Sequence, residues 1–92
     1  MANTLEWRRE VRNLAKEIIP RLLRTSGPWP MADIYASVQN ASEELCDDAF
    51  PCEHKGQPYG APEWRHQVRW ALQDLKHEGV ARGLARGQWG PA

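Results

Sequence analysis

The stretch PEWRHQVRWALQDLKHEG, residues 62–79, predicts one amphipathic helix whose two ends are marked in the sequence. Pro62 suits the first helical position because no N–H is needed there, and Gly79 suits the left-handed residue that follows a helix. Counted at about 100° per residue, one side of this helix is apolar and is expected to face the core. The apolar stripe consists of Trp64, Val68, Ala71, Leu72 and Leu75.

The opposite side of the same helix carries hydrogen-bond donors and cations. Side chains of these types are suited to phosphates and base edges. A solvated surface is the ordinary alternative for such a face, and the segments that follow decide between the two. The outward residues are Arg65, His66, Arg69, Gln73, Lys76 and His77.

The rest of the chain predicts further short elements around this helix. The first helix is expected to start near Asn3, where Asn3 and Glu6 resemble a capping box, and to kink or break near Ile19 because of Pro20. Residues 25–30 are expected to form a turn, and 49–61 a loop. We also expect helices at 31–38 and 40–48, the second of them opened by Asn40 and Glu43, and a hairpin with strands at 80–82 and 88–89 around a turn at 83–87.

Composition describes one small domain over residues 1–92. The hydrophobic share is 41%, with five Trp, which supports a single compact core. No apolar run approaches about 18 residues, so no membrane span and no membrane partner are expected. The first residues lack the apolar segment of a signal peptide, which indicates a cytoplasmic protein.

The net charge is zero, but the charges are separated along the chain. Residues 1–25 hold six Lys/Arg and three Asp/Glu, residues 26–60 hold one and six, and residues 61–92 hold five and three. The two ends are therefore basic and the middle is acidic. This separation allows a local basic face despite the neutral total.

The element order predicts a mainly α fold with a small C-terminal β-hairpin, in the pattern of a winged helix-turn-helix. In that pattern the last helix contacts DNA and the hairpin is the wing. Two alternatives are compatible with the same residues. One is a helical domain or winged helix that binds another protein, and the other is a winged-helix transcription regulator, which would also bind DNA.

The last third of the chain resembles the N-terminal domain of Mrr-type restriction endonucleases. The similarity covers Val68-Arg69-Trp70-Ala71-Leu72, Leu75-Lys76, Glu78-Gly79-Val80 and Arg86-Gly87-Gln88-Trp89. Two looser similarities are Pro20-Arg21-Leu22-Leu23 and Gly56-Gln57-Pro58. Two departures are Arg69, where the family often has Gly, and a last strand expected to be cut short by Gly90 and Pro91.

This resemblance implies a winged helix that binds double-stranded DNA as the targeting module of a restriction-type endonuclease. Such nucleases often act on modified, commonly methylated, DNA. The resemblance also implies a separate nuclease domain in the same protein, and the end of the chain just after the hairpin looks like a boundary with such a part. Target sequence and oligomeric state do not follow from it.

The candidate DNA-binding residues are those whose side chains can reach bases or phosphates. Arg can pair with guanine and Gln with adenine, whereas hairpin arginines are expected to meet phosphates in or beside the minor groove. Trp70 falls off the apolar stripe, so it either packs against the first helix or presents its ring to DNA. The candidates are Arg65, His66, Arg69, Gln73, Lys76, Arg82 and Arg86.

Metal and catalytic sites have little support. Cys46, Cys52 and His54, with His66 as a fourth ligand, have a spacing unlike that of zinc fingers, so a buried Cys, a loop Cys and an exposed His are the favoured interpretation. No Gly-rich phosphate loop or HExxH motif is present. We therefore expect no cofactor, no metal and no enzyme activity within these 92 residues.

Overall fold

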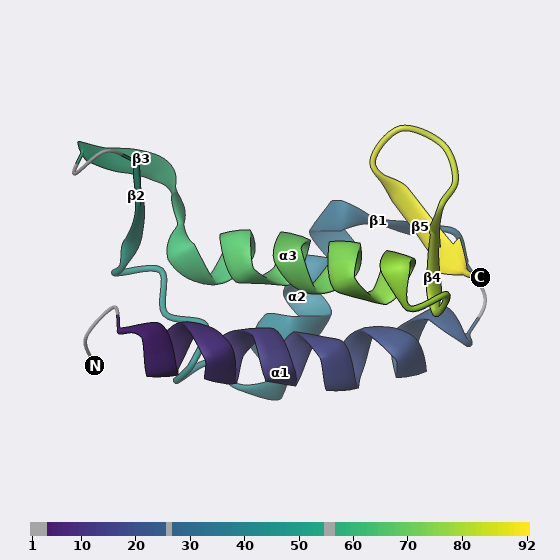
Figure 1. Cartoon of the computed structure of the whole chain (residues 1–92), viewed down its shortest axis with the longest axis horizontal. Helices are drawn as coiled ribbons and strands as arrows, with labels where there is room; N and C mark the ends of the chain where they lie inside the picture. The colour runs from purple at the N-terminus through teal and green to yellow at the C-terminus, as the bar shows by residue number, and fades with distance from the viewer. Residues whose placement is uncertain (1–3, 26, 55–56) are drawn as a thin grey trace.

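The computed structural model describes the backbone of residues 4–25, 27–54 and 57–92, and their side chains outside 52–60. Within these parts the chain is mainly helical with small antiparallel sheets, as predicted (Figure 1). The helices are α1 (Leu5–Leu23), α2 (Met31–Ala41) and α3 (Glu63–His77). The strands are β1 (Trp29–Pro30), β2 (Pro51–His54), β3 (Gln57–Pro62), β4 (Ala81–Gly83) and β5 (Gln88–Pro91).

Helix α3 forms where the sequence predicted it. Pro62 is the N-cap, one position earlier than expected, and the N–H of Glu63 donates to the carbonyl of Phe50 at 2.8 Å. Gly79 follows the C-cap with φ +77°, a left-handed conformation in which glycine carries no steric penalty. The C-terminal end of α3 is therefore set by local sequence, whereas the N-terminal end also depends on the hydrogen bond to Phe50.

The hydrophobic core lies between the helices. Helix α1 runs alongside α3, and α2 packs on both (Figure 1). Every residue of the predicted α3 stripe is buried, which confirms the prediction. The buried side chains of α1 and α2 that complete the core are Trp7, Val11, Ala15, Ile19, Leu23, Ile34 and Val38.

Helix α1 differs from its prediction at its start and at Pro20. Thr4 is the N-cap, and its Oγ1 accepts a hydrogen bond from the N–H of Trp7 at 3.1 Å. Asn3, the predicted cap, lies outside the described residues. Of the kink or break expected near Ile19, the break does not occur, since α1 continues through Pro20 to Leu23, and the kink stays a prediction. Ile19 and Leu23 are both buried, so core packing offsets the hydrogen bond that Pro20 cannot make.

The acidic segment after α2 is not the helix that was predicted at residues 40–48. Asn40 lies inside α2, which ends at Ala41. Ser42 instead starts a single turn: its Oγ accepts from the N–H of Leu45 at 3.2 Å, and its carbonyl accepts from the N–H of Cys46 at 3.0 Å. Ser and Asp side chains compete with helical hydrogen bonds in this way, so the turn does not continue as a helix.

Residues 51–54 and 57–62 form paired strands, where a loop was predicted. Strands β2 and β3 pair antiparallel with Glu53 opposite Pro58 and a register shift between Pro51 and Cys52. This hairpin lies at the N-terminal end of α3 (Figure 1). Its Pro and Gly residues made the segment look irregular in sequence, but prolines are tolerated in a two-stranded ribbon where N–H groups face outward.

The second sheet contains the predicted C-terminal hairpin and a strand that was not predicted. Its order is β1–β5–β4, with Trp29 opposite Trp89 and Arg82 opposite Gly90. The expected turn at residues 25–30 is thus partly strand. The expectation that Gly90 and Pro91 cut the last strand short is wrong, because β5 runs through Pro91.

Gly90 has a packing role inside β5. A Cβ at this position would lie 2.9 Å from Cδ1 of Leu84, so the absence of a side chain lets the hairpin turn fold back over the strand. No helix in the described residues is both long and apolar enough to cross a membrane.

Candidate nucleic-acid interface

The predicted contact residues of α3 lie on the side of the helix that faces away from the core. Arg65, Arg69, Gln73 and Lys76 are exposed, and His66 is partly exposed. They share one helix and follow its period, so they form a continuous strip of polar side chains. The structure therefore brings the α3 part of the candidate site together.

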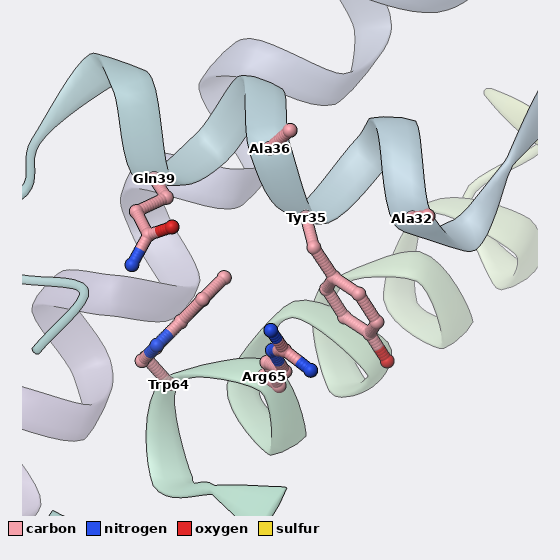
Figure 2. Close-up of a pocket in the computed structure, with 6 residues that line it drawn as sticks. All are labelled: Ala32, Tyr35, Ala36, Gln39, Trp64 and Arg65. Carbon is pink, nitrogen blue, oxygen red and sulfur yellow. The ribbon is translucent and has the colours of Figure 1, made fainter. Parts of the chain in front are cut away.

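Arg65 lies at the edge of this strip, next to α2. Its guanidinium carbon is 5.3 Å from the centre of the Tyr35 ring and 5.5 Å from that of Trp64, which is cation–π distance. These residues line a groove of about 310 Å³ between α2 and α3 (Figure 2). Arg65 is thus held by aromatic rings while its charge remains exposed.

The hydroxyl group of Tyr35 lies near the positive charges of this region. Burial raises the pKa of its hydroxyl, whereas the nearby positive charges of Arg69 and then Arg65 act to lower it. The hydroxyl therefore stays protonated at neutral pH and can serve as a donor. The contact of Tyr35 with Arg65 depends on how α2 crosses α3, which the sequence alone does not show.

The flank of α3 that faces α1 is occupied by contacts between the two helices. Basic residues spaced four apart on α1 meet acidic or amide side chains of α3 and its C-cap, so their charges are directed inward across the helix pair. The contacts are Arg8 with Glu63 at 3.6 Å, Arg12 with Gln67 at 2.9 and 3.1 Å, and Lys16 with Glu78 at 2.6 Å and Asp74 at 4.0 Å.

A shallow hollow lies in the middle of the outward face of α3. It measures about 160 Å³ and is lined by His66, Arg69, Trp70 and Gln73. The rings of His66 and Trp70 are stacked, with centres 5.9 Å apart and planes 18° apart. Trp70 is 48% exposed, and the guanidinium carbon of Arg12 lies over its ring, 5.8 Å from the ring centre. The predicted contact of Trp70 with the first helix is therefore confirmed, and presentation of its exposed ring to DNA stays a prediction.

The hairpin β4–β5 lies at the C-terminal end of α3 (Figure 1). Arg82 in β4 and Arg86 in the turn are both exposed. Leu84, between them, is exposed as well and was not singled out from the sequence. Its position between two arginines in a predicted turn was the available signal.

The arginines of the candidate interface form no ion pair within the described part of the chain. This holds for Arg65, Arg69, Arg82 and Arg86. Two acidic residues of the middle segment have other partners. Asp47 Oδ1 accepts from the N–H of Ala49 at 2.8 Å, and Asp48 Oδ1 accepts from Trp64 Nε1 at 2.7 Å.

Cys46 is buried, as the favoured interpretation of the cysteines expected. Its Sγ lies 3.8 Å from the carbonyl oxygen of Val38, and burial, with a smaller effect from Asp48, raises the pKa of the thiol to about 11. The side chains of Cys52 and His54 lie outside those that the structure describes. The described side chains contain no group of three potential metal ligands.

Cys46 is expected to resist alkylation until the domain unfolds. A Cys52→Ser variant isolates its reaction with iodoacetamide. Two pKa units, from 9.0 to about 11, lower the thiolate fraction at pH 8 about a hundredfold, and burial slows access further. Mass spectrometry with and without urea measures both rates. Equal rates in the two conditions would show that Cys46 is not buried in solution.

No protein-family model, curated protein or solved structure matches this chain. The similarity to Mrr-type restriction endonucleases therefore stays a prediction from short sequence strings. The function has to be argued from the geometry and charge of the described residues.

Proposed function

We propose that this chain is a winged-helix domain that binds double-stranded DNA through α3 and the β4–β5 hairpin. The order of the elements supports the fold: α1, β1, α2 and α3 are followed by the hairpin, and β5 pairs with both β1 and β4. In a winged helix, a short strand after the first helix joins the wing hairpin in the same way. The β2–β3 hairpin is then an insertion before the recognition helix.

The observation that carries the proposal is the division of the cations between two surfaces. Arg8, Arg12 and Lys16 contact α3 or its C-cap, whereas the interface arginines have no ion pair in the described part of the chain. Unpaired arginines attract phosphates and release counterions when they bind them. A protein-binding winged helix would be supported by arginines paired with Glu43 or Asp47, and the described residues contain no such pair.

The geometry of α3 suits a major groove. Its 15 residues give a length of about 22 Å, and a B-DNA major groove about 12 Å wide admits a helix. Arg69 lies near the middle of the exposed strip, where the helix would be closest to base edges. The hairpin at the end of the helix brings Arg86 to phosphates or to the neighbouring minor groove.

We also propose, from the sequence resemblance alone, that the domain targets a restriction-type nuclease to DNA. In that case the catalytic residues lie in another domain of the same protein. Recognition of a modified base belongs to the same proposal. The sequence of the full gene tests the first part directly, because a nuclease motif after Ala92 is required.

Arg69→Ala and Arg86→Ala are expected to weaken DNA binding in different ways. Loss of a bidentate contact to guanine at Arg69 costs about 1–3 kcal/mol on the preferred sequence and much less on random DNA. Loss of a phosphate contact at Arg86 weakens all duplexes alike and lowers the slope of log affinity against log salt by about one unit. Titration of labelled duplexes at several salt concentrations measures both.

Gln88→Ala serves as a control for these variants, because it changes an uncharged residue of β5 beside the turn. It is expected to leave the salt slope unchanged. If the parent protein binds no duplex even at low salt, the DNA-binding proposal is wrong. Binding to a protein surface would then take its place.

A further inference from the structure

We propose that the hollow of His66, Arg69, Trp70 and Gln73 receives the 5-methyl group of a pyrimidine in the major groove. This inference rests on the proposed DNA binding by α3, and it names the base feature that one part of α3 recognises. In ordinary DNA the methyl group belongs to thymine, to which we assign the site. 5-Methylcytosine carries the same group at the same ring position.

The first step of the argument is the exposure of Trp70. A single exposed apolar side chain is common on a protein surface, so the exposure of Trp70 is informative only together with the hollow that it lines. Trp70 is 48% exposed near the middle of α3, whereas all five residues of the apolar stripe are buried. Its stack with His66 fixes the ring and leaves an apolar wall along the hollow.

The surface that would face the hollow is the row of base edges in the major groove. The edges of base pairs in the major groove carry donors, acceptors and one apolar group, the thymine methyl. The ring face of Trp70 can make an apolar contact with that methyl group. The indole N–H can donate to a phosphate or a hydroxyl oxygen, but the ring face makes no apolar contact with either.

The third step is the position of the polar neighbours. Arg69 precedes Trp70, and Gln73 lies one turn further on, so the same hollow is bordered by donors for guanine and adenine edges. Apolar and hydrogen-bonding contacts to adjacent base pairs are then made together. We therefore expect the preferred site to contain a thymine beside the guanine that Arg69 contacts.

The experiment removes the methyl group from DNA without changing base pairing. A preferred duplex is selected from a random pool, and each thymine in turn is replaced by deoxyuridine. At one position the affinity of the parent protein is expected to fall about fourfold, the value of one buried methyl group. At other positions the affinity should stay the same.

A double-mutant cycle assigns the effect to the hollow. Trp70→Ala is expected to lose about the same factor on the thymine duplex and to show no further loss with deoxyuridine. Trp70→Phe keeps an aromatic wall and should retain part of the discrimination. A circular dichroism melt of each variant checks that the fold is kept.

Further arms of the experiment separate the possible outcomes. Replacing each cytosine by 5-methylcytosine identifies the source: a gain only there assigns the methyl group to that base and overturns the assignment to thymine. A deoxyuridine penalty that persists unchanged in Trp70→Ala overturns the role of the hollow. If salt-dependent duplex binding remains but no methyl group matters, the proposed DNA binding stands and this inference falls.

Discussion

Trp64→Ala is expected to destabilise the domain by about 3–5 kcal/mol, which is a large part of the stability of a chain of this size. The side chain is fully buried, and its ring meets that of Tyr35 edge to face at 5.8 Å. Its Nε1 also donates to Asp48 at 2.7 Å, so the substitution removes a hydrogen bond and leaves a cavity. Urea denaturation followed by circular dichroism measures the change.

Trp70→Ala is the matched control, since it removes the same residue type from the same helix. Trp70 is 48% exposed, so its substitution should cost less than about 1.5 kcal/mol, with most of the loss coming from the Arg12 contact. Equal costs for the two tryptophans would mean that the outward and inward faces of α3 are assigned the wrong way round.

Substitution of Arg69, Arg82 and Arg86 together by Gln is expected to produce the largest loss of DNA binding. These side chains are exposed and are expected to contact phosphates or bases, so their removal releases fewer counterions. The slope of log affinity against log salt should fall by about two to three units. Fluorescence anisotropy on one duplex between low and moderate salt measures the slope.

The control for this variant removes the same charge from another surface. Arg9 and Arg21 lie on α1, Arg24 is its C-cap, and all three are exposed. Arg21 has a surface pair with Glu17 at 3.3 Å. Their substitution by Gln changes the net charge equally but should leave the salt slope within error of the parent. If both triple variants lose binding alike, the attraction comes from overall charge and not from an interface on α3 and the hairpin.

Helix α3 could be predicted because its determinants are local. The stripe from Trp64 to Leu75 has the period of a helix, and Gly79 marks the end with a conformation that other residues rarely adopt. The outward residues then followed from the same period. For this reason the outward orientation of the α3 candidates is as predicted, whereas their contact with DNA stays a prediction.

The strands outside the C-terminal hairpin could not be predicted, because their hydrogen bonds come from distant segments. β1 is two residues long and exists only because β5 lies beside it, with Trp29 opposite Trp89. Similarly, Asn40 resembled a helix start in sequence, but α2 continued past it, since Val38 is buried in the core. In both cases contacts with distant segments, and not local sequence signals, determined the structure.

The contacts that shape the candidate site also depend on the tertiary fold. No sequence pattern indicated that Arg12 would reach Gln67 and Trp70, or that Tyr35 would lie beside Arg65. Such pairs require the crossing angles of α1 and α2 on α3. Periodicity assigns a residue to a face, but it does not identify the neighbour across the helix boundary.

The pairing of β5 with β1 means that backbone hydrogen bonds fix the distance between the two halves of the surface. The hairpin is joined to the segment before α2 through the β1–β5 ladder and the Met31 N–H, which donates to the Gly87 carbonyl at 3.0 Å. Side chains on α3 or on the hairpin can therefore change without altering the spacing between them. Substitutions on α3 or on the hairpin could then change what that element contacts while the spacing between the two elements stays constant.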